Sequence, residues 1–333
     1  NPYWDTLQTP TMEQILQAVH KVEIVVEPDK HFKYSNLAFA LLGEVITRVS
    51  GQQYEEYVES KILRPLEMNS TFFDSSKGEC VPQATGYETN TNTGIPREAP
   101  NPHMRGISAA GQLYSTVSDL AKWIALQFRT NAIDHCGTQV LAGHSLVEMH
   151  RPVFLEPDWS MGYGLPWISS RLGNQVLVGH TGFLFGYRAD ISFNTETKLG
   201  VIALFNTSAL PPVRRKIYQL AFESDASMPT ATPMQVPSKP PKHLQDYVGL
   251  YNASLGLTMR VDYRNPNLVF SIEVGSSLGF APGIINETHQ ADVFKATEGR
   301  WIGEEVTFVR SSNSLVEGFE LGPFRFHKIS DGQ

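Results

Sequence analysis

The sequence predicts an α+β fold in which helices flank an antiparallel sheet, followed by a small all-β domain. Three observations predict it. At 333 residues the chain exceeds the length at which a single hydrophobic core usually stops growing. Helix and strand patterns alternate as far as residue 227, and short strand patterns punctuated by glycine and asparagine fill the chain after residue 242.

The domain boundary follows from a proline-rich stretch. We expect a large domain at residues 1–227, a linker at 228–242 and a small domain at 243–333. The linker carries five prolines among small polar residues, which is typical of an extended connection. Strands are expected in the small domain near residues 257–261, 268–274 and 305–309.

Three helices are expected between residues 36 and 128 of the large domain. Ser35 can cap a helix over residues 36–49 that Gly51 ends, and its apolar residues recur at a spacing that predicts a mostly buried helix. A second helix is expected over residues 54–63. A third begins near residues 116–119 and continues to Phe128.

A hairpin follows later in the chain. Residues 187–193 alternate between apolar and polar side chains, and residues 195–198 form a turn into a second strand at 199–205. Because this second strand is apolar almost throughout, we expect both of its faces to be covered. The next helix offers one apolar stripe for this purpose: Val213, Ile217, Leu220 and Ala221.

Composition excludes some partners. The formal net charge is −7 and no dense cluster of lysine and arginine occurs, so we expect no nucleic-acid partner. No apolar run approaches the length of a membrane-spanning helix. Residue 1 is Asn rather than Met and no leader pattern follows it, so a processed, trimmed or partial chain is expected.

The cysteines and the N-glycosylation sequons bear on whether the protein is secreted. Cys80 and Cys136 allow one disulfide or two separate thiols. The sequons mildly favour a secreted, extracellular glycoprotein. They lie at Asn69, Asn206, Asn252 and Asn286.

We expect no cofactor and no metal, because His135, His144 and His150 lack the close pairing of a metal site. The tryptophans are expected to be packing residues, although Trp159 and Trp167 flank a Gly-Tyr-Gly segment and could line a pocket. Residues 75–111 lack periodicity and could equally be a binding loop or a surface excursion.

Two short motifs are candidates for chemistry. Tyr34-Ser35-Asn36 lies where an extended segment becomes a helix, and Gly179-His180-Thr181-Gly182 precedes the hairpin. Each has an ordinary structural interpretation. Tyrosine, serine and asparagine at a helix start usually pack or cap, and glycine in a strand usually marks a bulge.

Together, in this order and separation, the motifs resemble the penicillin-binding-protein-like serine hydrolases, which include class C β-lactamases, D-Ala-D-Ala carboxypeptidases, D-amino acid amidases and related esterases. Flanking segments agree, among them Leu63-Arg64-Pro65-Leu66-Glu67-Met68 and Gly162-Tyr163-Gly164-Leu165. The resemblance covers roughly residues 1–225. The tail from about Leu244 resembles the small β-barrel-like domain appended to many members.

This resemblance implies a β-lactamase/transpeptidase-like fold and acyl transfer through a covalent serine intermediate. The family uses three motifs, Ser-x-x-Lys, Tyr-x-Asn and Lys/His-Thr-Gly on a strand edge. By this likeness Tyr34 would be the general base or proton relay, with nearby positive charge stabilising its phenolate. Asn36 would hold the substrate's acyl-side amide or orient the lysine.

The third motif has its own implied roles. His180 would stand where many members have lysine, and would lend a proton or hydrogen bond to the network. The backbone N–H of Phe183 would form half of the oxyanion hole, and Thr181 and Gly182 would line the edge where substrate pairs.

The nucleophile is the missing part. No serine is followed three positions later by lysine, and the nearest formal match, Thr195 with Lys198, falls in the hairpin turn and is rejected. We therefore expect the serine upstream of Asn1, in a segment that would complete this fold. The predicted function is hydrolysis of a small ester, amide or peptide; the alternative is a catalytically inactive binding or assembly protein.

Overall fold

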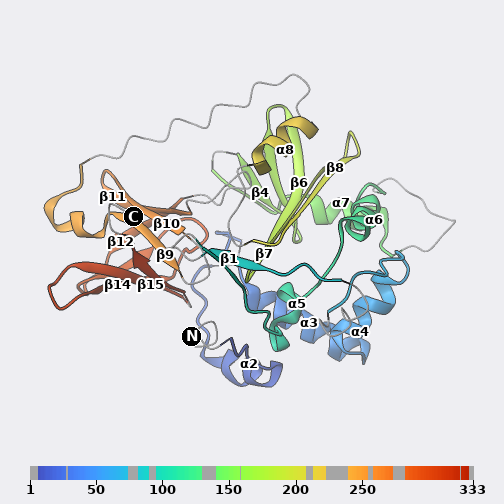
Figure 1. The fold of residues 1–333 in the computed structure, drawn as a ribbon, viewed down its shortest axis with the longest axis horizontal. Coiled ribbons are helices and arrows are strands. Elements are labelled where there is room, and N and C mark those ends of the chain that lie inside the picture. The colour runs from blue at the N-terminus through green and yellow to red at the C-terminus, as the bar shows by residue number, and fades with distance from the viewer. Residues whose placement is uncertain are drawn as a thin grey trace.

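The structure is a computed structural model that describes residues 7–27, 29–73, 82–89, 95–129, 140–157, 159–207, 213–222, 239–253, 258–272, 282–322 and 324–329. Helices and a six-stranded sheet occupy the first part of the chain, and a closed β-barrel lies beside them (Figure 1). The two cysteines, His135 and most of the expected linker fall outside the described residues. The predicted domain boundaries stay predictions.

The sheet is antiparallel throughout and its strands follow chain order, which confirms the predicted fold class. At the turn between the last two strands, the Asn194 side chain accepts the backbone N–H groups of Glu196 and Thr197 at 2.8 and 3.0 Å. This side-chain turn fixes the register of the hairpin. The strands are β3 Phe154–Leu155, β4 Met161–Tyr163, β5 Ile168–Leu172, β6 Gln175–Leu184, β7 Tyr187–Asn194 and β8 Leu199–Phe205.

Helices cover both faces of β8, as predicted. Ile202 packs with the cluster around helix α6 (Val117–Gln127), whereas Val201 packs with Tyr218 and Phe222 of helix α8 (Val213–Phe222). Figure 1 shows α8 lying across one side of the sheet.

The predicted stripe on α8 is partly wrong, because Leu220 is 72% exposed. The buried positions are Tyr218 and Phe222, with Ile217 and Ala221 partly buried. Tyr218 takes the central place because its hydroxyl donates to Asp190 at 2.6 Å and lies 2.8 Å from the Ser192 hydroxyl, both on β7. These hydrogen bonds satisfy the buried Tyr218 hydroxyl and orient α8 so that its aromatic side chains face the sheet.

The helical layer contains the three predicted helices. Helix α3 (Asn36–Ser50) begins where the Ser35 hydroxyl accepts the Ala38 N–H at 3.1 Å, and it ends at Gly51 with a φ of 72°. Helix α4 (Tyr54–Val58) continues as a π-helix over Glu59–Leu63. Shorter elements complete the layer: α2 Met12–Ala18, 3-10 turns at Val19–Lys21 and Arg105–Ile107, α5 Ser108–Gly111, α7 Gly143–His150, and the strand pair β1 Tyr87–Thr89 and β2 Pro96–Glu98.

The prediction that α3 is mostly buried is wrong. Within the helix only Ala40 and Gly43 are buried, where it packs closely against α5. Four large apolar side chains on α3 are between 42% and 84% exposed, because no described residue covers them. They are Phe39, Leu42, Val45 and Val49, spaced at three or four residues along one side of the helix.

Asp119 ties α6 to the segment that follows the π-helix. Its carboxylate accepts the Ser70 backbone N–H at 2.7 Å and the Thr71 hydroxyl at 2.9 Å, and it lies 3.1 Å from the Lys122 ammonium group. The Asp119 carboxylate is buried, so these three donors offset its loss of solvent.

The C-terminal part is an eight-stranded antiparallel barrel closed between β16 and β9, which confirms the predicted all-β, barrel-like domain. Its interior is filled largely by aromatic rings, including Tyr251, Phe294, Phe308 and Phe319. The strands are β9 Gly249–Ala253, β10 Thr258–Arg264, β11 Asn267–Ile272, β12 Gly283–Glu287, β13 Val293–Ala296, β14 Glu305–Arg310, β15 Val316–Leu321 and β16 Phe324–Lys328.

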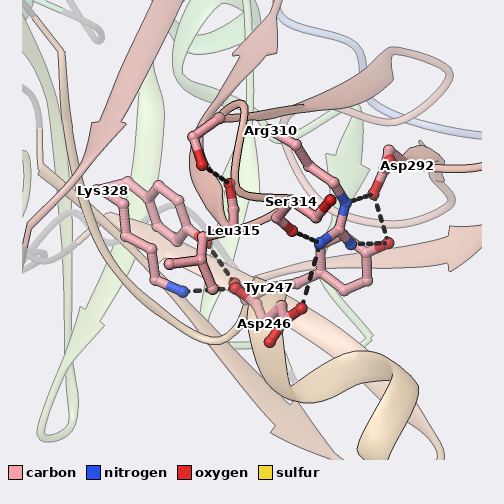
Figure 2. A network of polar contacts seen from close by, with 9 residues as sticks. Asp246, Tyr247, Asp292, Arg310, Ser314, Leu315 and Lys328 are labelled. Atoms are coloured by element: carbon pink, nitrogen blue, oxygen red, sulfur yellow. Dashed lines mark hydrogen bonds and ion pairs between the residues drawn. The ribbon is translucent and has the colours of Figure 1, made fainter.

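A polar network fastens the 3-10 helix at Lys242–Tyr247 to this barrel (Figure 2). The Arg310 guanidinium donates to Asp292 at 2.8 Å, to Asp246 at 3.2 Å and to the Tyr247 hydroxyl at 3.1 Å. The Tyr247 hydroxyl in turn donates to Asp292 at 2.7 Å. The entry of the chain into the barrel is therefore fixed by charge-assisted hydrogen bonds as well as by packing.

Candidate active site

The two motifs singled out from the sequence meet in space. The rings of Tyr34 and His180 lie side by side, with centroids 6.4 Å apart and planes inclined by 29°. Tyr34 is held by the start of α3, where Ser35 caps the helix, and His180 is held by β6. Because a helix start and a sheet strand position the two rings, their relative geometry is set by rigid elements.

His180 lies where β6 loses one of its two neighbours. Pairing with β5 ends at Ile168 opposite Gly179, whereas pairing with β7 continues to Leu184 opposite Tyr187. Within the described residues, the stretch from His180 to Leu184 therefore has an open edge on the β5 side. An open edge presents backbone N–H and C=O groups to which an extended ligand can pair.

The two glycines of the second motif differ. A side chain at Gly179 would place its Cβ 2.2 Å from the carbonyl oxygen of Ile191, so this glycine permits close approach of β7. At Gly182 the nearest atom to such a Cβ is the Ala189 Cβ at 3.3 Å. Gly179 is therefore explained by its close contact with the neighbouring strand β7. For Gly182, the approach of a ligand to the strand backbone stays a prediction.

The protonation of His180 follows from its hydrogen bond. Nδ1 lies 2.7 Å from the carbonyl oxygen of Thr181, and a carbonyl only accepts, so Nδ1 donates. Burial lowers the pKa of His180 below its ordinary 6.5; Arg300 lowers it further, while the Thr181 hydrogen bond and Asp190 raise it. Near neutral pH the ring is therefore uncharged, with Nε2 as the acceptor.

Arg300 is a residue of this site that no sequence motif indicated. It belongs to the barrel, in the turn between β13 and β14, and its Cζ lies 4.3 Å from the centroid of the Tyr34 ring. Buried Tyr163 also faces this charge, and its hydroxyl donates to Glu156 at 3.2 Å. Burial and Glu156 raise the pKa of Tyr163, while Arg300 lowers it.

The remaining predicted site residues lie around this pair. Thr181 and Gly182 are half-buried on β6, and Phe183 is 38% exposed with the Arg188 guanidinium 4.3 Å from its ring centroid. Asn36 opens α3 and is exposed. The roles assigned to these residues stay predictions.

A family model described as Beta-lactamase matches residues 1–226. This chain belongs to the beta-lactamase family. The match includes both motifs and the six-stranded sheet and ends before the barrel. It confirms the resemblance on which the sequence prediction rested.

Curated relatives of this beta-lactamase-family chain are distant. Protein flp of Staphylococcus aureus strain N315 is 27% identical over 198 residues, which cover 60% of this chain and 38% of that protein. Beta-lactamase-like protein 2 of Dictyostelium discoideum is 28% identical over 193 residues, which cover 57% of this chain and 34% of that protein. The chain thus spans little more than a third of these relatives.

Solved structures share the fold. The octameric penicillin-binding protein homologue from Pyrococcus abyssi aligns with a TM-score of 0.56 at 26% identity, over 96% of this chain and 70% of that one. A D-stereospecific amidohydrolase from Streptomyces sp. aligns with a TM-score of 0.54 at 22% identity, over 66% of this chain and 63% of that one. The first alignment extends through the barrel, so the architecture of both parts is shared.

Other residues singled out in this beta-lactamase-family sequence have structural roles. His150 is buried, and its Nε2 donates to the Gln127 side-chain oxygen at 3.0 Å. Trp167 is a packing residue, because it is buried edge-on against Phe193 with centroids 5.1 Å apart. Trp159 is 64% exposed.

No group of three His, Cys, Asp or Glu side chains in the described ranges is placed to hold a metal ion. None of the helices in the described part of the chain is both long and apolar enough to span a membrane.

Of the sequon asparagines, Asn252 is buried at 8% exposure in β9, whereas Asn69, Asn206 and Asn286 are exposed.

Proposed function

We propose that this protein is a serine hydrolase that acts on a small ester, amide or peptide through an acyl-enzyme. The observation that carries the proposal is the pairing of Tyr34 with His180 at the open edge of β6. The family match and the amidohydrolase fold neighbour support the reaction class.

In this proposal each of these residues has a separate role in the reaction. The serine hydroxyl attacks the substrate carbonyl carbon as Tyr34 accepts its proton, and the C–N or C–O bond breaks as that proton passes to the leaving group. Neutral His180, with Nε2 as acceptor, keeps this proton path oriented. The backbone N–H of Phe183, on the open edge, donates to the oxyanion together with the N–H of the serine. Water then hydrolyses the acyl-enzyme.

We propose that the nucleophile lies in a segment upstream of Asn1 that packs on the exposed face of α3. The sequence given contains no Ser-x-x-Lys, and it spans only 70% of the Pyrococcus homologue. The four apolar side chains from Phe39 to Val49 form the kind of surface that a packed segment covers. Such a segment would bring the serine to the helix start that holds Tyr34.

Labelling of the native protein with a fluorophosphonate or a β-lactam tests this function, with the labelled peptide located by mass spectrometry. We expect one labelled serine, followed three residues later by lysine. Tyr34→Phe should lower turnover about a hundredfold or more while leaving the circular dichroism spectrum unchanged. The control Tyr57→Phe should retain full turnover. Unchanged turnover in Tyr34→Phe would remove this residue from the mechanism.

The second candidate is a catalytically inactive binding or assembly protein that keeps the fold without the serine. The same labelling decides between the two. If the native protein takes no label and its N-terminal sequence holds no Ser-x-x-Lys, the hydrolase proposal fails.

We also propose an extracellular location with glycans on the exposed sequons. The exposed side chains of Asn69, Asn206 and Asn286 leave room for a glycan, whereas buried Asn252 does not. Treatment of protein from its native source with an N-glycosidase should reduce its mass. An unchanged mass would refute the proposal.

A further inference from the structure

The segment that leads into Tyr34 depends on contacts with other elements. The described residues between 22 and 35 form no helix or strand, so side-chain contacts have to hold this segment in place. Phe32 supplies one such contact, because its ring stacks on that of Tyr163 with centroids 3.5 Å apart and planes inclined by 8°. This contact fixes the segment to β4, two residues before Tyr34.

The barrel supplies a second contact, through the turn at residues 297–304 that joins β13 to β14. The Lys33 ammonium donates to the Glu304 carboxylate at 2.7 Å, across 271 residues of sequence, and the two side chains are 19% and 35% exposed. Gly303 lies so close to Val25 that an added Cβ would sit 2.5 Å from the Val25 Cβ. The turn therefore meets the segment at two places, one of them immediately before the candidate base.

This turn is a rigid part of the barrel. Backbone hydrogen bonds tie it at its base, from the Ala296 N–H to the Glu304 carbonyl at 2.9 Å and from the Gly303 N–H to the Ala296 carbonyl at 2.8 Å. Trp301 packs against the barrel core and lies edge-on to Phe324 with centroids 5.9 Å apart. Because the turn is fixed in this way, the ion-paired segment is held relative to the whole barrel.

The energetics of the ion pair suit a positioning role. A partly exposed ion pair contributes little to stability, because solvent screens it and ordering two long side chains costs entropy. It does define a distance and a direction, since a charge-assisted hydrogen bond is short and needs alignment. Catalysis is sensitive to such placement, and a displacement of about 1 Å can lower a rate on the order of 100-fold. Lys33 precedes Tyr34 directly, so the pair acts next to the residue whose placement matters.

We propose that Lys33 and Glu304 are positioning residues, and that through their ion pair the barrel holds Tyr34 beside His180 for proton transfer. The inference rests on the proposed hydrolase function, in which Tyr34 accepts the proton of the serine. The same turn also contacts the Tyr34 ring, with the Arg300 Cζ 4.3 Å from the ring centroid. A barrel whose interior is filled by its own side chains thus takes part in the reaction through one of its outer turns.

Charge reversal tests the inference in the full-length protein, with p-nitrophenyl acetate as substrate. Lys33→Glu and Glu304→Lys each place like charges opposite each other, which separates the turn from the segment. We expect each variant to lower kcat about 10- to 100-fold and to change KM no more than about threefold, because the open edge of β6 is left as it is. The double variant restores the ion pair with its signs exchanged, and its kcat should return to within about threefold of wild type.

Lys30→Glu is the matched control. It makes the same change of charge three residues earlier, at an exposed side chain that pairs with Glu27, and it should leave kcat unchanged. Wild-type kcat in both single variants at positions 33 and 304 would overturn the proposal. A double variant as slow as the slower single variant would do the same, since it would show that the two residues do not act as a pair.

A measurement without substrate separates this inference from the function on which it rests. The rings of His180 and Tyr34 lie side by side with centroids 6.4 Å apart, so the NMR signals of the His180 ring report the place of Tyr34 through its ring current. At one fixed pH these signals should shift in Lys33→Glu and in Glu304→Lys and return in the double variant. Unchanged signals in the single variants would refute the positioning role. If wild-type protein hydrolyses no ester, the hydrolase proposal fails and the NMR signals alone decide whether the barrel positions Tyr34.

Discussion

Acid should destabilise the large domain through His150. This residue ends α7, is buried beside Trp167 and Phe193, and donates from Nε2 to Gln127. Burial lowers the pKa of His150 from 6.5 to about 4. The unfolded chain therefore binds a proton on this ring more readily than the folded protein does, and acid favours unfolding.

The size and pH range of the effect follow from the two pKa values. The difference between 6.5 and about 4 corresponds to about 3 kcal/mol in the free energy of unfolding. None of this stability is lost above pH 6.5. The loss grows as the pH falls from 6.5 to about 4 and is complete below that value.

The assay is urea unfolding at several values between pH 7.5 and pH 4, followed by tryptophan fluorescence because Trp167 contacts His150. His150→Gln keeps a donor for Gln127 but has no proton to gain, so its stability should fall with acid by about 3 kcal/mol less than that of wild-type protein. His144→Gln, at an exposed position of the same helix, should behave like wild type. Parallel losses in wild type and His150→Gln would refute the reasoning.

Three further predictions concern the site and its support. The NMR signal of the His180 ring should titrate below pH 6.5, and titration above 7 would contradict its neutral state. Gly179→Ala should cost about 1–3 kcal/mol, since the new Cβ meets the Ile191 carbonyl, whereas Gly182→Ala should cost less; equal melting temperatures would refute this. Asp119→Ala should cost about 3 kcal/mol in urea unfolding, because it leaves a backbone N–H and a buried hydroxyl without their acceptor; a loss below about 1 kcal/mol would count against it.

Sequence reasoning succeeded where the determining interactions are local. The Ser35 cap and the Gly51 stop act within one helical turn, and α3 forms between them as predicted. The hairpin of β7 and β8 follows equally from alternation and a short polar turn. The family resemblance implied one network that includes Tyr34 and His180, and their rings lie 6.4 Å apart. The roles assigned to the two residues stay predictions.

The sequence-based predictions of burial and of site residues were wrong or incomplete where they depend on distant parts of the chain. Apolar spacing predicted a buried α3, but spacing does not say which residues cover the helix, and Val49 is 84% exposed. Leu220 lost its predicted place because Tyr218 reaches the polar groups of β7. Arg300 carries no local signal at all, because its role depends on how the barrel meets the segment before Tyr34.

The neutral state of His180 depends in part on the position of Arg300, because the nearby cation lowers the pKa of His180. A cation at position 180 would lie beside the half-buried Arg300 guanidinium, and two like charges there would repel each other in a site of low dielectric. The structure avoids this because the Nδ1–H of His180 is committed to the Thr181 carbonyl and burial opposes a second proton. The positive charge beside Tyr34 is therefore carried by the barrel, in the same turn whose Glu304 accepts a hydrogen bond from Lys33.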